Sequence, residues 1–214
     1  PLLLLGRALL PFLFARGSEG GVEAGLDGGR EATRGRGSAR ADIAFHYDVS
    51  NRFYGLFLDP AMVYTCAYFR DWSNDLATAQ QDKLELICRK LRLKPGDRLL
   101  DIGCGWGALV CHAAEHHGVR ALGVTLSEQQ VEVARQRIAA RGLADRVEVR
   151  LQDFREVDGR FDKVASIGMF EHVGIANHAA YFRKVRSLLV PGGLYLHHAI
   201  ARRGKATDRS FRRK

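Results

Sequence analysis

Apolar residues along this chain follow spacings that predict most of its elements. Between Leu76 and Leu91 the apolar positions have the spacing of a helix with one buried face. Asp75 is a good N-cap for this helix because its carboxylate can accept a hydrogen bond from a first-turn N–H. Lys94-Pro-Gly-Asp97 then ends the helical pattern.

From Arg98 onward, short apolar runs alternate with helical segments. The predicted strands are 98–102, 120–125, 147–151, 161–167 and 194–200. The predicted helices are 108–117, 128–141 and 177–189, with Ser127 as an N-cap, Gly142 as a stop and 191–193 as a turn. This alternation predicts a doubly wound α/β fold around a mainly parallel sheet. Ligands of such folds bind beyond the carboxyl ends of the strands, so the loops there are expected to form one cleft.

The part of the chain before residue 95 divides by composition. Residues 1–14 are apolar but too short to cross a bilayer, and no basic region precedes them as in a signal peptide. Residues 17–40 are rich in Gly, Arg, Glu and Ser, which is typical of a linker or a disordered segment. We therefore divide the chain into a flexible or remnant segment (1–40), a helical cap (41–94) and a core that contains the sheet (95–214).

The cap holds a dense group of apolar residues, which are Phe53, Tyr54, Leu56, Phe57 and Leu58. They are too close together for one core-facing helical stripe. Two interpretations stay open: they line a pocket or a lipid-facing entrance, or they pack this segment onto the core.

The composition suits one globular domain, but the charge is uneven. The chain has 214 residues, 46% hydrophobic and 27% charged, with a formal net charge of +9. Residues 202–214 hold seven Lys or Arg against one Asp, which suits anionic lipid or nucleic acid as well as a solvated segment. The sequence lacks a nucleic-acid-binding motif, so we expect no nucleic-acid partner. The cysteines, at 66, 88, 104 and 111, lack metal-ligand spacing, which favours a reducing cytoplasm and predicts no metal site.

The stretch Leu99-Leu-Asp-Ile-Gly-Cys-Gly-Trp-Gly107 predicts a buried strand, a tight turn and the start of a helix. Glycines let the backbone turn sharply and leave room for a ligand against the helix N-terminus. The acid Asp101 followed by glycines at 103, 105 and 107 resembles the first motif of class I S-adenosylmethionine (SAM) methyltransferases. In that motif the acid helps to place the methionine end of the cofactor. The alternatives are another nucleotide and a purely structural turn.

Polar residues at the next two strand ends suggest further contacts. Strand 120–125 ends at Thr125, where dinucleotide-binding proteins usually have an acid, so neutral groups such as Thr125 and Gln130 are expected to hold the ligand there. Asp153 follows the third strand. It is either an acceptor for an adenine amino group or a helix cap or surface carboxylate.

Ionisable groups gather near the ends of the last two strands. Glu171 follows strand 161–167, and His197 and His198 lie on strand 194–200. Because side chains alternate along a strand, at most one of these histidines faces the cleft. Together with Glu171 it could perform acid–base chemistry or bind a small ion. The alternative is a structural, hydrogen-bonded histidine.

Six motifs, taken together, resemble those of the cyclopropane-fatty-acyl-phospholipid synthases and mycolic acid cyclopropane synthases, from about residue 42 to the end of the chain. They are Tyr47-Asp-Val-Ser-Asn-Arg-Phe-Tyr54, Phe57-Leu-Asp-Pro60, Tyr64-Thr-Cys-Ala-Tyr-Phe69, 101–107, Gly123-Val-Thr-Leu-Ser127 and Gly168-Met-Phe-Glu-His-Val-Gly174. The resemblance implies SAM-dependent transfer of a methylene group to a cis double bond of a phospholipid acyl chain, which forms a cyclopropane ring. In the family the alkene attacks the sulfonium methyl, and a bound bicarbonate ion takes the proton lost as the ring closes.

The resemblance also implies the site residues and partners. The bicarbonate holders are Cys66, through its backbone N–H, Glu171 and His198, the last because the family's His-Thr-Ile-Gly aligns with 198–201. The SAM shell is Tyr64, Thr65, Gly103, Gly105, Thr125, Leu126, Gln130 and Ile167, besides Asp101 and Asp153. The cap would cover the cofactor and the acyl chain. The implied partners are the acyl chains of phospholipids, which a cytoplasmic protein would meet at the inner face of the membrane. Whether the protein forms a homodimer is left open.

Some features depart from the family pattern. Arg52 stands where an acid is common, Thr65 for serine, Ala199 for threonine and Ala201 for glycine. Residues 208–214 resemble the start of a family segment that continues further, so we expect a C-terminally truncated sheet and a chain of uncertain activity. Two alternatives remain: a SAM-dependent methyltransferase that acts on another acyl chain or an amine without ring closure, and an inactive SAM-binding fragment.

Overall fold

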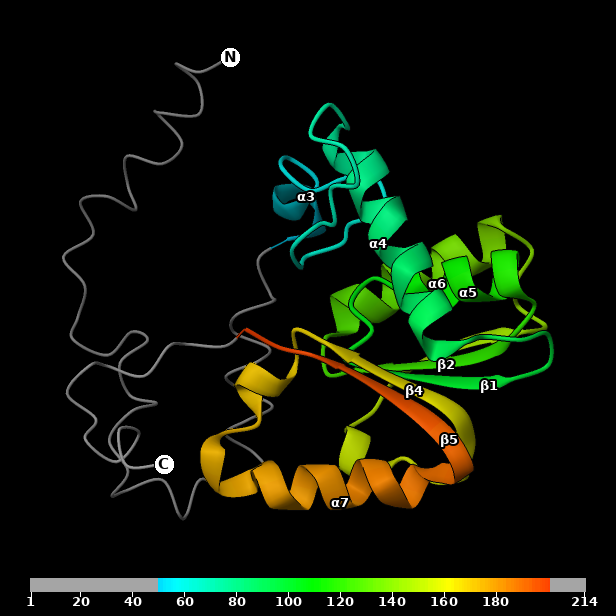
Figure 1. Cartoon of the computed structure of the whole chain (residues 1–214). Coiled ribbons are helices and arrows are strands. Elements are labelled where there is room, and N and C mark those ends of the chain that lie inside the picture. The colour runs from blue at the N-terminus through cyan, green and yellow to red at the C-terminus, as the bar shows by residue number, and fades with distance from the viewer. Residues whose placement is uncertain (1–49, 201–214) are drawn as a thin grey trace, which may run out of the picture. The chain divides into compact units, whose positions relative to one another are not determined.

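A computed structural model of the protein describes residues 50–200, which fold around a five-stranded sheet (Figure 1). All its neighbouring strands pair in parallel, in the order β3-β2-β1-β4-β5, which confirms the predicted sheet. The strands are β1 (Arg98–Ile102), β2 (Arg120–Thr125), β3 (Val147–Leu151), β4 (Phe161–Ile167) and β5 (Leu189–His198). The chain order reverses between β1 and β4, and such a switch point is where ligands of these sheets bind.

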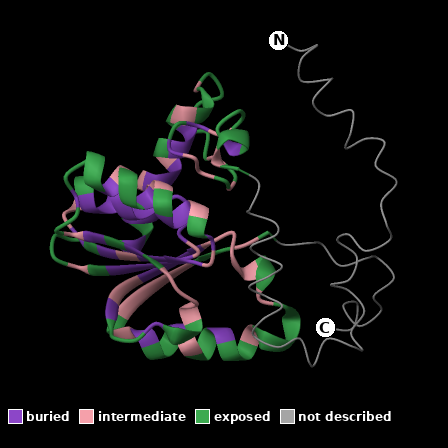
Figure 2. Cartoon of the chain, turned by 180° about the vertical axis from the view of Figure 1, so that it is seen from behind, coloured by how far each residue is buried: buried purple, intermediate pink, exposed green. Residues whose placement is uncertain are grey.

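Three helices cover one face of the sheet: α4 (Leu76–Leu91), α5 (Ala108–His117) and α6 (Glu128–Ala140) (Figure 1). Figure 2 shows buried residues concentrated where these helices meet the strands. Both predicted caps are confirmed. The Asp75 carboxylate accepts a hydrogen bond from the Thr78 N–H at 2.8 Å, and the Ser127 hydroxyl accepts one from the Gln130 N–H at 3.3 Å.

The opposite face is covered by α7 (His178–Leu188), whose buried residues Tyr181, Val185 and Leu188 pack on Leu100 and Val164 of the sheet. The short helix η1 (Phe154–Glu156) connects β3 to β4. Two further 3₁₀ helices, η2 (Phe170–His172) and η3 (Ile175–Asn177), lead from β4 to α7. The loop that follows β4 therefore starts at the switch point and is held by short helices.

The turn predicted at 191–193 is wrong, because β5 runs through it. Leu189 pairs with Phe161 and Leu194 pairs with Lys163, so the residues between them bulge out of the ladder. In the described part of the chain β5 is an edge strand, where proline is tolerated because fewer ladder donors are needed. β5 also ends at His198, two residues before the predicted end.

The segment before α4 contains α3 (Asn51–Tyr54). Its apolar residues agree in part with each interpretation, since one packs on the core and others face solvent. Tyr54 is buried, with its ring 5.0 Å from that of Trp106, whereas Leu56 and Phe57 are exposed. Among residues 50–200 no helix has the length and apolar character to cross a membrane. The predictions made for residues 1–49 and for the basic residues 202–214 lie outside the described residues.

Candidate active site

The glycine turn after β1 lies at the switch point and has the predicted strand–turn–helix setting. Gly105 has a backbone φ of +54°, and a Cβ atom added there would meet nothing within 4 Å. α5 begins directly after the turn and has no side-chain cap. The N–H groups of its first turn therefore lack helical carbonyl partners and can serve a ligand.

Asp101 is a buried acid just before this turn. Asp101 lies on β1 and is 3% exposed. Burial raises the pKa of its carboxyl to about 7, because removal from water disfavours the charged form. A cation placed next to this buried carboxyl would stabilise its ionised form.

At the end of β2 the predicted neutral groups pair with each other. The Thr125 hydroxyl donates to the Gln130 side-chain oxygen at 2.6 Å, and both side chains are buried. Leu126, between them in sequence, is half-buried. The hydrogen bond fixes the Gln130 amide with its oxygen toward Thr125.

Asp153 acts as a cap. Its carboxylate accepts a hydrogen bond from the Arg155 N–H at 2.9 Å at the start of η1 and pairs with the Arg155 guanidinium. The capping role that the sequence left open is therefore observed. The adenine contact stays a prediction.

The anion-holding residues implied by the resemblance lie at the carboxyl ends of β4 and β5. His198 Nε2 lies 3.7 Å from Cys66 Sγ, although the two residues are far apart in the sequence. Glu171, on η2, accepts a hydrogen bond from the Ile200 N–H through its carboxylate. All three predicted holders are solvent-exposed, so a substrate can reach them. We call Cys66, Glu171 and His198 the anion corner, after the role that the resemblance predicts for them.

The anion corner adjoins both the predicted SAM-shell residues and the glycine turn. Ile167 of β4 is in register with His198 of β5. A Cβ atom added to Gly168 would lie 2.7 Å from a methyl carbon of Thr65, and one added to Gly103 would lie 2.8 Å from Met169. Glycine therefore allows these segments to approach closely. The structure thus brings residues from four separate segments to one end of the sheet.

His197 lies on the other face, as strand alternation predicts. Its Nδ1 is 2.9 Å from the Tyr195 hydroxyl, and its ring is edge-on to Phe170 at 4.7 Å between centroids. These contacts belong to the aromatic group around α7. The two histidines therefore lie on opposite faces of β5, and the role of His198 stays a prediction.

Two buried polar residues of α4 hold the segment that contains Cys66, and the sequence analysis missed both. The Gln80 amide donates to the carbonyls of Val63 and Thr65 at 3.1 and 2.9 Å. The Lys83 amine donates to the Thr65 hydroxyl at 2.5 Å, and burial lowers its pKa to about 8. The sequence could have revealed them, because these two polar residues, three positions apart, lie on a helix face that is otherwise apolar.

Comparisons with known proteins place this site in a family. The family model described as mycolic acid cyclopropane synthetase matches residues 35–213. A probable fatty acid methyltransferase of Pseudomonas putida is 53% identical over 160 residues, which cover 74% of this chain and 41% of the relative. The cyclopropane-fatty-acyl-phospholipid synthase of Escherichia coli K12 is 47% identical over 163 residues, which cover 76% of this chain and 41% of the relative. The chain thus spans about 41% of the length of these relatives.

A solved structure agrees with the sequence matches. The structure of mycolic acid cyclopropane synthase CmaA1 complexed with SAH and CTAB has a TM-score of 0.68 and 40% identity, and the match covers 71% of this chain and 53% of that chain. The parallel sheet with its flanking helices is the class I SAM methyltransferase fold. From the family match and the shared fold we conclude that this chain belongs to the mycolic acid cyclopropane synthetase family, as its motifs predict.

Proposed function

We propose that this protein transfers a methylene group from SAM to a cis double bond of an unsaturated phospholipid acyl chain, which forms a cyclopropane ring. The observation that carries the proposal is the anion corner, in which Cys66, Glu171 and His198 gather at the end of the sheet next to the glycine turn. The proposal also holds that the protein is cytoplasmic, that it meets acyl chains at the inner face of the membrane and that it has no nucleic-acid partner.

The residues of the glycine turn fit SAM on two counts. The open space at Gly105 leaves room for a ligand against the start of α5. The buried carboxyl of Asp101 suits the ammonium group at the methionine end of SAM, because that cation would compensate the cost of burying the carboxylate. Thr125 and Gln130 supply neutral hydrogen-bonding groups at the next strand end.

The anion corner fits bicarbonate. When bound, SAM supplies the electrophilic methyl carbon, and bicarbonate supplies the base that takes the proton released on ring closure. The His198 imidazole can donate a hydrogen bond to an anion from Nε2. Glu171 is an acceptor when ionised, so it favours an anion with its own O–H donor, as bicarbonate has. The Ile200 N–H holds the Glu171 carboxylate in place for this contact.

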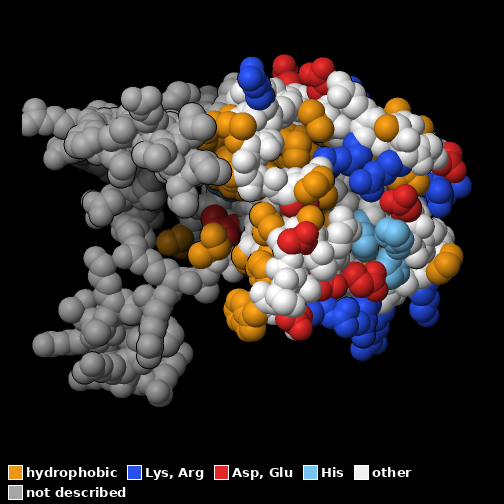
Figure 3. Space-filling view, turned by 90° about the horizontal axis from the view of Figure 1, so that it is seen from above, with side chains coloured by type: hydrophobic (Ala, Val, Ile, Leu, Met, Phe, Trp, Pro, Cys, Tyr) orange, Lys and Arg blue, Asp and Glu red, His pale blue; other side chains and the backbone are white. Residues whose placement is uncertain are grey.

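An exposed apolar surface lies on the segment that leads to the anion corner. It comprises Phe53, Leu56, Phe57, Tyr64, Tyr68 and Phe69, all at least 37% exposed. Figure 3 shows hydrophobic side chains exposed at many places on the face seen from above, more of them in its left half. An exposed apolar group of this kind suits an acyl chain. A bound chain would also shield the reacting carbons from water.

Product analysis tests the proposed function. The protein is incubated with methyl-labelled SAM, bicarbonate and vesicles of a cis-unsaturated phosphatidylglycerol, and the released fatty acids are examined by mass spectrometry and proton NMR. We expect a gain of one CH₂, loss of the olefinic signal and the upfield signals of ring protons. His198→Ala should lower the rate by about 10²-fold or more, as expected when a group that holds the base is lost.

His197→Gln is the matched control, since this neighbour faces α7 and its hydrogen-bonding ability is retained. It should leave the rate close to that of the unaltered protein. A labelled amine, or no labelled lipid under any of these conditions, contradicts the proposal.

Methyl transfer without ring closure is the second candidate. The observation that favours it is the 53% identity to the relative named a probable fatty acid methyltransferase. The same NMR spectra distinguish the two, because a methyl or methylene branch lacks the upfield ring signals.

A further inference from the structure

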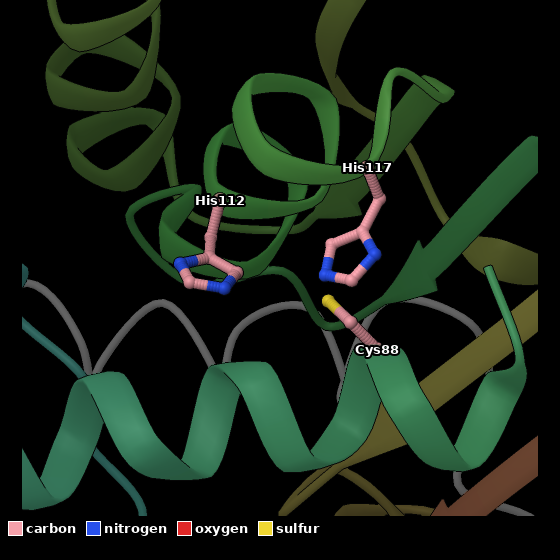
Figure 4. Close-up of side chains that lie close together, drawn as sticks. All are labelled: Cys88, His112 and His117. Carbon is pink, nitrogen blue, oxygen red and sulfur yellow. The ribbon is translucent and has the colours of Figure 1, made fainter. Parts of the chain in front are cut away.

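A cluster of metal-ligand side chains lies between α4 and α5 and takes no part in the proposed reaction. Cys88 comes from α4, and His112 and His117 come from α5. Figure 4 shows the Cys88 sulfur directed from α4 toward the side of α5 that carries both imidazoles. Their ligand atoms all lie within 4.8 Å of one another.

Glu85, one turn before Cys88 on α4, contacts both imidazoles of this cluster. Its Oε2 lies 2.9 Å from His117 Nε2 and 3.4 Å from His112 Nε2. Both imidazoles therefore already point one nitrogen at a single carboxylate oxygen. The cluster thus gathers one thiol, two imidazoles and one carboxylate from two packed helices.

This donor set matches a particular class of cation. Thiolate and imidazole ligands favour Zn²⁺ and similar divalent transition metals, whereas Mg²⁺ and Ca²⁺ prefer oxygen ligands alone. Four such donors suit the four-coordinate, tetrahedral geometry of structural zinc sites. The cluster is also within reach of solvent, since the His117 side chain is 18% exposed and that of Glu85 is 41% exposed. Figure 3 shows histidine side chains at the surface beside acidic ones.

Metal binding changes the protonation of the thiol. Metals are bound by thiolate and by neutral imidazole, so when the ion binds Cys88 the S–H bond breaks, the proton goes to solvent and a metal–sulfur bond forms in its place.

We propose that Cys88, His112, His117 and Glu85 bind one divalent transition-metal ion of the Zn²⁺ class, which ties α4 to α5. The site is structural. It lies on the helix that also carries Gln80 and Lys83, so the metal stabilises the layer that holds the Cys66 segment. The inference does not depend on the proposed function.

Cobalt binding tests the proposal directly. The full chain, purified without a polyhistidine tag and stripped with a chelator, is titrated with Co²⁺ and followed by absorbance. We expect one ion per chain, a near-ultraviolet thiolate-to-cobalt charge-transfer band and visible bands of tetrahedral strength, all displaced by one equivalent of Zn²⁺. Absence of the charge-transfer band, or octahedral spectra only, overturns the proposal.

Two matched pairs of variants locate the ion. Cys88→Ala should abolish the charge-transfer band, whereas Cys111→Ala, at another buried thiol of the same core, should retain it. His117→Gln should weaken Co²⁺ binding by more than the roughly 10- to 100-fold that loss of an outer-shell partner causes. His116→Gln, at a 54% exposed side chain one position earlier, should leave binding unchanged.

Thermal unfolding gives a second readout that keeps the test decisive if Cys88→Ala does not fold. Zn²⁺ should raise the Tm of the unaltered protein and of His116→Gln, but not that of His117→Gln. Equal shifts in the two histidine variants, or no shift in any of them, overturn the proposal.

Discussion

Replacement of Asp101 by asparagine should make the protein without SAM more stable above pH 7 while weakening its binding of SAM. The pKa of Asp101 rises from an ordinary 3.8 to about 7 because the carboxyl is buried. Each pKa unit corresponds to about 1.4 kcal/mol, so ionised Asp101 lowers the free energy of unfolding by up to about 4 kcal/mol. Asparagine has the same size and no charge, and it removes this cost.

The sign of the pH dependence follows from the two pKa values. Between about pH 4 and pH 7 the native state holds a proton on Asp101 that the unfolded state has lost, so stability falls as pH rises through this range. Above pH 7 both states are ionised, and the full cost is present. The difference in stability between Asp101→Asn and the unaltered protein should therefore grow from pH 5 to pH 8 and then level off.

Urea unfolding followed by circular dichroism at pH 5, 6, 7 and 8 measures this difference, and calorimetric titration with S-adenosylhomocysteine measures cofactor affinity. Asp101→Asn should lose about tenfold or more in affinity at pH 8, since a charge-assisted hydrogen bond contributes about 1.5–3 kcal/mol. Asp145→Asn, at a 72% exposed side chain, is the control and should change neither quantity. The reasoning is refuted if Asp101→Asn is less stable at pH 8 and its stability follows the same pH curve as the unaltered protein.

Three further changes test other parts of the account. Lys83→Met should lower the turnover rate without loss of stability, because it removes the amine that holds Thr65 and also a buried charge. Lys90→Met, on the exposed side of α4, should change neither the turnover rate nor the stability. Turnover rates and urea unfolding are compared for both variants. Gly168→Ala should lower the free energy of unfolding, measured in urea, by about 1–3 kcal/mol, because φ is +64° and the added Cβ would lie 2.7 Å from a neighbouring side chain. Gly159→Ala, at a glycine that also has a positive φ but open space around it, should lower the free energy of unfolding by less. Leu56→Ser, at a residue 77% exposed, should weaken sedimentation with phospholipid vesicles by about tenfold while leaving stability unchanged; equal sedimentation contradicts the acyl-entry role.

Local signals explain why most of the fold is predictable from the sequence. The strand and helix positions follow from apolar spacing, and Asp75 and Ser127 form the caps that their residue types suggest. The opposite orientations of His197 and His198 follow from strand alternation alone.

The misses come from interactions between distant segments. The Pro-Gly-Gly at 191–193 has the local signature of a turn, but pairing of Leu189 and Leu194 with β4 carries the strand through it. The cluster of Cys88, His112 and His117 has no recognisable spacing, because its members come from two helices that meet only in the folded protein. Its metal-ligand character therefore requires the packing of α4 on α5.

Anion binding at the Cys66, Glu171 and His198 corner is the central claim, and carbon-13 NMR of labelled bicarbonate tests it without requiring turnover. With S-adenosylhomocysteine present, the bicarbonate signal should broaden on addition of the unaltered protein and of His197→Gln, but not of Glu171→Gln or His198→Ala. No broadening with the unaltered protein, or the same broadening with all three variants, would contradict the account.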